Sequence, residues 1–67
     1  MLFTERFNEI LKNSGAKQTD LAKYCNVTRQ SVSDFKKGKS VPSIETLYYI
    51  CKFFDCSADY LLGLSDI

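Results

Sequence analysis

The sequence contains no histidine, and its three cysteines include no CxxC pair. Histidine is the commonest metal ligand and the usual general base, and cysteine-type zinc sites are built from closely spaced pairs. No serine or cysteine lies in a recognisable nucleophile motif either. We therefore expect that the chain is not an enzyme and holds no metal or cofactor, and that Cys25, Cys51 and Cys56 serve as small buried hydrophobic side chains.

Long apolar stretches are missing as well. The densest one, from Leu47 to Phe54, is interrupted by Lys52 and is far shorter than the roughly 20 residues of a membrane-spanning helix. The first residues, Met1 to Glu5, lack the basic start and apolar run of a signal peptide. With 67 residues, of which 45% are hydrophobic, the sequence predicts one folded domain over residues 1–67 in the cytoplasm.

Charge is spread unevenly along the chain, although the net charge is only +1. Residues 17–40 carry six basic and two acidic side chains, a net of +4, whereas residues 41–67 carry a net of −3. This polarity suits a domain that turns one face toward a polyanion such as a nucleic acid. Since a charged segment is more often only a solvated surface, the argument needs a motif beside it.

Apolar residues recur every three or four positions along the whole chain, which is the spacing of helices. Capping and turn residues divide this pattern into segments, because Ser and Thr favour helix starts and Gly and Asn favour helix ends. The pattern predicts an all-α protein of five helices. The first helix starts near Phe3 and stops before Gly15, and the second runs from near Gln18 to Asn26. The last three run from the cap Thr28 to Gly38, from the cap Ser43 through Phe54, and from the cap Ser57 to Gly63.

The residues of the second and third predicted helices, and of the turn between them, predict a helix-turn-helix. Ala22 is small enough for a steep crossing of two helices, Asn26 tolerates the positive φ of a tight turn, and Val27 is an apolar plug after it. Val32 and Phe35 then anchor the third helix to the core. This arrangement leaves a polar face of the third helix pointing away from the protein.

The residue types on that polar face are those that read DNA bases. Arginine pairs with guanine and glutamine with adenine through two hydrogen bonds each, and serine is adaptable. We expect Arg29, Gln30 and Ser33, in the first turns of the helix, to contact base edges. We expect contacts to the DNA backbone from five polar residues around them, Gln18, Thr28, Lys37, Lys39 and Ser40.

The sequence resembles the Cro/cI-type (XRE) helix-turn-helix domains of phage and bacterial transcriptional regulators from Phe3 to Gly63. The resemblance is carried by Gln18, Ala22, Val27, Val32, Phe35, Lys37-Gly38, Val41-Pro42-Ser43, Leu47 and residues 57–63. It implies a compact lambda-repressor-like fold with the helix-turn-helix at residues 18–37. It also implies a sequence-specific, repressor-like regulator whose third helix enters the major groove of double-stranded DNA, and whose dimers bind two-fold-related half-sites.

Three positions depart from the pattern of that family. Lys17 replaces the usual Ser or Thr cap, and Asn26 replaces the usual glycine. Asp34 is the more serious departure, because a carboxylate at the edge of the DNA-facing surface would repel phosphate. It could accept a hydrogen bond from cytosine or pair with Lys37 three residues later. We expect the pairing with Lys37, and Asp34 also stays a candidate base contact.

The fourth predicted helix bears on self-association. Its core-facing stripe is expected to consist of Ile44, Leu47, Ile50, Cys51 and Phe54. Tyr49 and Phe53 fall on the opposite face, and Leu64 and Ile67 trail beyond the last helix. Because a contiguous exposed apolar patch marks an interface, we expect a homodimer through the C-terminal half, with Tyr49, Phe53, Leu64 and Ile67 as candidate contacts.

An alternative function is open at this point. The acidic C-terminal segment, Asp34 and the aromatic residues also fit a protein-interaction module, antitoxin-like or adaptor-like, that keeps the fold without strong DNA binding. The operator sequence, the choice between repression and activation, any effector, and whether the chain is a whole regulator or the N-terminal domain of a longer one do not follow from these residues.

Overall fold

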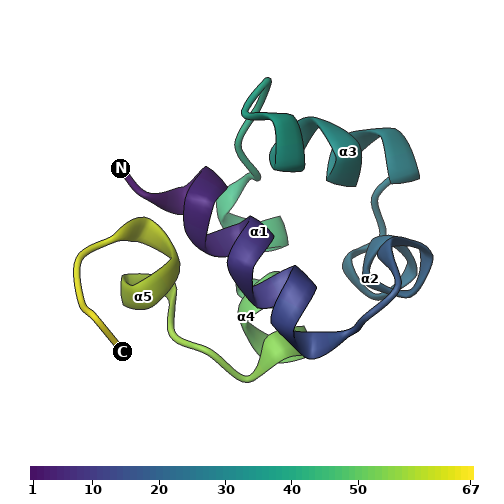
Figure 1. Cartoon of the computed structure of the whole chain (residues 1–67). Helices are drawn as coiled ribbons and strands as arrows, with labels where there is room; N and C mark the ends of the chain where they lie inside the picture. Colours follow the sequence, from purple (N-terminus) through teal and green to yellow (C-terminus); the bar gives the residue numbers. More distant parts are fainter.

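The computed structural model describes residues 1–67 and contains five helices and no strand. Figure 1 shows α1 crossing the middle of the molecule, with α3 along one edge and α5 at the opposite side. The helices are α1 (Phe3–Ser14), α2 (Gln18–Cys25), α3 (Arg29–Lys37), α4 (Ile44–Phe54) and α5 (Ala58–Leu62). The expected all-α fold of five helices is therefore confirmed. None of the helices has both the length and the apolar character needed to cross a membrane.

The helix ends follow from local chemistry that the sequence already indicated. The side-chain oxygens of Thr28, Ser43 and Ser57 accept hydrogen bonds from the backbone N–H groups three residues later, and so cap α3, α4 and α5. At the other ends, glycines take the left-handed conformation, and Asn26 and Asp55 adopt it with φ of 56° and 54°. By contrast, α1 and α2 have no side-chain cap.

An aromatic cluster at the centre of the core fixes α3 against α1. The rings of Phe3 and Phe7 stack with centroids 5.2 Å apart, and both meet the Phe35 ring edge-on at 6.3 and 6.1 Å. Val32 is buried beside them. The expected anchoring of α3 by Val32 and Phe35 is thus confirmed, and it sets the direction in which the opposite face of α3 points.

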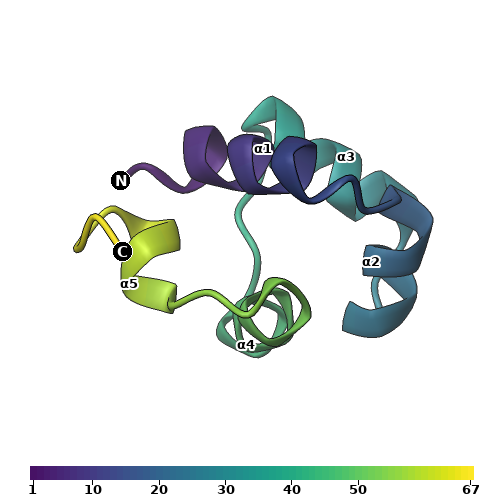
Figure 2. The ribbon, with the colours of Figure 1, turned by 60° about the horizontal axis from the view of Figure 1, so that its bottom comes forward.

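The core as a whole draws side chains from all five helices. Figure 2 shows α4 lying below α1, between α2 at one end and α5 at the other. The buried apolar side chains of these helices are Phe3, Phe7, Leu11, Leu21, Ala22, Cys25, Val32, Phe35, Ile50 and Leu61.

The expected orientation of α4 is wrong in part. Ile44 is 89% exposed, although it belongs to the stripe expected to face the core, and Thr46 is buried instead. Tyr49 and Phe53, expected on the outer face, are half-buried and pack against the Tyr24 ring of α2, with centroids 6.1 and 5.4 Å away. The physical reason is that α4 packs against both α2 and α5, so its buried arc is wider than one stripe and is turned toward α2.

Arg6 ties α1 to the last residues of the chain. Its Nη1 donates hydrogen bonds to the carbonyl oxygens of Tyr60, at 2.7 Å, and of Ser65. The guanidinium carbon lies 4.5 Å from the centre of the Tyr60 ring, a cation–π arrangement, and Nη2 lies 3.6 Å from the carboxylate of Asp66. The segment after α5 is therefore held against α1 by one side chain.

Candidate nucleic-acid interface

The turn between α2 and α3 is built by backbone hydrogen bonds. The N–H of Asn26 donates to the carbonyl of Lys23 at 3.2 Å, and the N–H of Val27 donates to that of Ala22 at 3.0 Å. Ala22 is buried at this crossing, as its small size predicts. The hydroxyl of Thr28 then accepts from the N–H of Ser31 at 3.0 Å, which fixes where α3 begins.

Five of the residues expected at the site line one shallow depression on the surface. They come from the start of α2 and the first turns of α3 and are Gln18, Thr28, Arg29, Gln30 and Ser33. None of them is apolar, and Arg29 and Gln30 are exposed while Ser33 and Gln18 are half-buried. The three residues expected to contact bases and two of those expected to contact the backbone are therefore neighbours in space.

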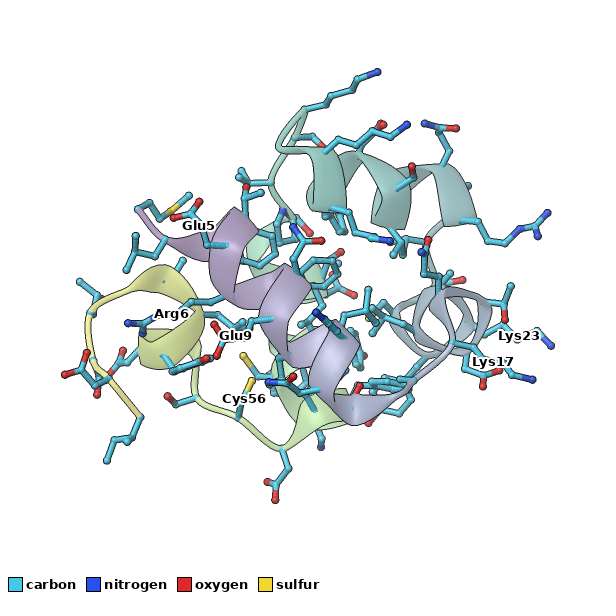
Figure 3. All side chains as sticks on the ribbon, in the orientation of Figure 1. Glu5, Arg6, Glu9, Lys17, Lys23 and Cys56 are labelled. Atoms are coloured by element: carbon cyan, nitrogen blue, oxygen red, sulfur yellow. The ribbon has the colours of Figure 1, made fainter.

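The other expected backbone contacts lie at the far end of α3. Lys37 is the last residue of the helix, and Lys39 and Ser40 follow Gly38. All three side chains are exposed. Figure 3 shows the polar side chains of α3 reaching away from the body of the molecule along its whole length. Lys37 thus lies about one helical turn beyond Ser33, the residue of the depression nearest to it along α3.

Asp34 has a different partner from the one expected. Its Oδ1 accepts a hydrogen bond from Nε2 of Gln30 at 2.9 Å, and the ion pair in the structure is that of Arg6 with Asp66. The expected pairing of Asp34 with Lys37 is thus wrong. Residues three and four apart on a helix both share a face, and here the neighbour four positions earlier supplies the donor.

Asn8 is a site residue that sequence reasoning missed. Its Nδ2 donates to the carbonyl of Lys36 at 2.9 Å and to that of Thr4 at 2.8 Å. The first of these bonds links the last turn of α3 to α1, so Asn8 helps to set the position of the helix that carries the site. A polar residue next to the buried stripe of the first helix was the available signal, but its partner lies 28 residues away.

Further basic side chains flank the depression. Lys12 and Lys36 line a hollow between α1 and α3 on one side of Gln18, and Lys23 and Arg29 line a groove between α2 and α3 on the other. Figure 3 shows Lys17 and Lys23 pointing outward on the side of α2, away from Glu5 and Glu9 of α1. The surface around α2 and α3 thus offers hydrogen-bond donors and positive charge, and no group of three or more metal-binding side chains lies there.

The sequence matches a known protein family and a known transcriptional regulator. A family model described as helix-turn-helix matches residues 8–61. The HTH-type transcriptional activator BcrR of Enterococcus faecalis is 34% identical over 63 residues, which are 94% of this chain and 31% of that protein. The chain therefore spans about a third of the length of this relative.

Two solved structures have the same fold. A transcriptional regulator from Listeria innocua superposes with a TM-score of 0.84 and 31% identity, over 91% of this chain and 57% of that one. The P22 c2 repressor, in complex with a synthetic operator, superposes with a TM-score of 0.82 and 30% identity, over 91% and 92% of the two chains. The second comparison covers nearly the whole of both chains, so the expected lambda-repressor-like fold is confirmed.

Proposed function

Because the chain belongs to the Cro/cI-type (XRE) helix-turn-helix family of transcriptional regulators, we propose that it binds operator DNA and reads bases with α3 in the major groove. The observation that carries this proposal is the division of α3 into two faces. Val32 and Phe35 are buried on one face, and Arg29, Gln30 and Ser33 line a polar surface on the other. A helix supported in this way can enter the groove without disturbing the core.

Base reading begins with Arg29 and Gln30. The exposed guanidinium of Arg29 can donate two hydrogen bonds to O6 and N7 of a guanine. Gln30 uses one N–H of its amide on Asp34, so its second N–H and its Oε1 stay free for N7 and N6 of an adenine. Asp34 therefore acts as a positioning residue for Gln30 instead of pairing with Lys37. It also stays a candidate base contact, because its second carboxylate oxygen can accept a hydrogen bond from N4 of a cytosine.

Backbone contacts come from the residues on either side of that reading face. Gln18 is the first residue of α2, where unpaired backbone N–H groups favour a phosphate. Lys37, Lys39 and Ser40 supply charge and donors at the other end of α3. Thr28 already accepts the capping bond from the N–H of Ser31, and the two hydroxyl groups are hydrogen-bonded at 3.0 Å. With the Ser31 hydroxyl as the donor of that second bond, the hydroxyl of Thr28 can donate to a phosphate oxygen.

The protein acts as a homodimer on its operator, in this proposal, with contacts from the C-terminal half. Leu64 is 77% and Ile67 is 91% exposed, and the exposed Ile44 adds a third apolar side chain there. Tyr49 and Phe53 contribute less than expected because they pack against α2. Half-sites would be spaced by one DNA turn, roughly 34 Å. A monomer in sedimentation at high concentration, both alone and with a palindromic duplex, would exclude this dimer.

The direction of regulation depends on where the operator lies relative to the promoter. Similarity to the P22 c2 repressor over nearly its whole chain supports repressor-like action, whereas BcrR, of which the matched part is about a third, is an activator. We propose repression by occupancy of the operator, which needs no domain beyond the one described.

Selection of bound duplexes from a random pool tests the proposed function. The expected result is an enriched palindromic site that contains guanine and adenine, bound with an affinity that falls log-linearly with salt as phosphate contacts release counterions. Failure to enrich any sequence, with no binding even at low salt, would contradict base reading. It would favour the protein-interaction module, for which a stable complex with a protein partner is the positive evidence.

A further inference from the structure

The end of α4 brings two cysteines together. Asp55 takes the left-handed conformation there, and the N–H of Cys56 donates to the carbonyl of Cys51 at 3.0 Å. A backbone bond between residues five apart is characteristic of helices that end in a left-handed residue. At such ends the side chains of the two bonded residues frequently contact each other. The two thiols are also close enough for each to shift the pKa of the other. Figure 3 shows a second sulfur atom beside that of the labelled Cys56.

Comparison with the other helix ends shows how specific this pair is. The same bond between residues five apart closes four helix ends, where the paired residues are Val27 and Ala22, Lys39 and Asp34, Cys56 and Cys51, and Leu64 and Asp59. Only at α4 are both members cysteines. The sequence expectation of three inert cysteines therefore holds best for Cys25, which is buried in the core, whereas Cys51 and Cys56 are half-buried neighbours.

We propose that Cys51 and Cys56 form a dithiol site that small-molecule disulfides, such as oxidised glutathione, convert to an intramolecular disulfide. The geometry supports this because the backbone bond from Cys56 to Cys51 holds the two residues side by side at the end of α4, so closing the disulfide requires little movement of the backbone. The site lies on the far side of α1 from α3 (Figure 3). It is therefore independent of the proposed DNA interface, and its test does not depend on DNA binding.

The two thiols differ in the order in which they react. Burial raises the pKa of Cys51, and the hydrogen bond from Cys56 lowers it again in part. Burial raises the pKa of Cys56 to about 11, helped by the charge of Cys51, the hydrogen bond to Cys51 and the charge of Asp55. Cys51 is therefore the first to lose its proton and become the nucleophile, and Cys56 is the resolving residue.

The exchange balances without any further reactant. The Cys51 thiolate attacks one sulfur of oxidised glutathione, forms a mixed disulfide and releases one glutathione thiolate, which takes up the proton that Cys51 lost. Cys56 then loses its proton and attacks the sulfur of Cys51, which releases the second glutathione. Two protein thiols are oxidised to one disulfide, and one glutathione disulfide is reduced to two thiols.

Peptide mapping after incubation with oxidised glutathione tests the proposal. Trypsin cuts after Lys52, so the disulfide would join the otherwise separate peptides 40–52 and 53–67. The expected product is monomeric, lighter than the reduced chain by two hydrogen atoms, and carries a free Cys25 in the peptide 24–29. The cross-link would also raise Tm by roughly 5 °C or more, since it restricts the unfolded chain.

Serine variants provide matched controls. Cys25→Ser should form the same linked peptide pair, whereas Cys51→Ser and Cys56→Ser should form none, show no oxidation-dependent rise in Tm, and leave the remaining thiol free or bound to glutathione. Persistent glutathione on both Cys51 and Cys56 of the wild type would overturn the proposal. Covalent dimers, or links to Cys25, as the main product would overturn it as well.

Discussion

Asp34 lies beside the surface that we propose to meet DNA, where a free carboxylate would weaken binding by repelling phosphates. Its Oδ1 instead accepts a hydrogen bond from Gln30, one turn earlier on α3. A partly satisfied carboxylate costs less near DNA than a free one, and the bond restricts the rotamers of Gln30. At the scale of single residues, the repulsion between Asp34 and the DNA phosphates is thus offset by a more ordered Gln30 side chain.

Replacement of Asp34 tests this role. In Asp34→Ala, Gln30 loses its anchor, so we expect weaker discrimination at the adenine it reads, by about 1 kcal/mol. Affinity for unrelated duplexes should rise slightly, because a negative charge is gone. Dissociation constants for a set of single-base variants of the operator, at fixed salt, measure both effects.

The control is Asp59→Ala, which removes an exposed carboxylate from α5, on the other side of the molecule. It should leave base discrimination unchanged. A specific role for Asp34 would be contradicted if Asp34→Ala lost discrimination at the base pair that Arg29 reads and kept it at the base pair that Gln30 reads.

At the scale of helices, the sequence was sufficient for the number of elements and for most of their ends. Caps and left-handed stops act through bonds within a few residues, and such bonds can be read from neighbouring sequence. The orientation of α4 could not be read in this way. A single apolar stripe does not reveal that α2 and α5 both pack on the same helix, so Tyr49 and Ile44 were assigned to the wrong faces.

The same limit applies to the candidate site. The polar face of α3 followed from the period of the helix and from the anchors Val32 and Phe35. The partner of Asp34 did not, because neighbours at three and four residues are equally close. Asn8 was missed because its bond to Lys36 joins segments 28 residues apart, a distance that only the fold determines.

The N-cap of α3 carries a prediction at the scale of elements. Thr28→Ala removes the acceptor for the N–H of Ser31 and should destabilise the protein by about 1 kcal/mol, a fall in Tm of roughly 4–8 °C for a domain of this size. Thermal unfolding followed by circular dichroism measures it. Thr28→Ser keeps the acceptor and should stay close to the wild type. Equal loss in both variants would show that the methyl group, rather than the cap, is responsible.

For the whole molecule, Arg6 is the side chain that joins the chain's first helix to its last residues. Two of its contacts are hydrogen bonds to carbonyl oxygens, of Tyr60 and Ser65, and its side chain is only 17% exposed. Hydrogen bonds from a charged group are among the stronger ones in proteins. We infer that Arg6 stabilises the position of α5 against α1.

Arg6→Gln tests this inference. The variant should unfold about 1.5–3 kcal/mol more easily, because the carbonyls lose a charged donor and the Tyr60 ring loses its cation. Urea unfolding gives the free energy directly. Asp66→Asn is the matched control, since the Asp66 side chain is fully exposed at 103% and an ion pair in water contributes little. A larger loss in Asp66→Asn than in Arg6→Gln would show that the ion pair dominates.

The central claim is that α3 reads bases through the side chains opposite its buried face. Affinities of Arg29→Ala and Gln30→Ala for the selected operator and for its single-base variants, measured over a range of salt concentrations, test it most directly. The account predicts that each variant loses about 1–3 kcal/mol on the operator, loses preference at one base pair, and keeps the salt dependence set by Lys37 and Lys39. Unchanged preference at every base pair in both variants would contradict the claim.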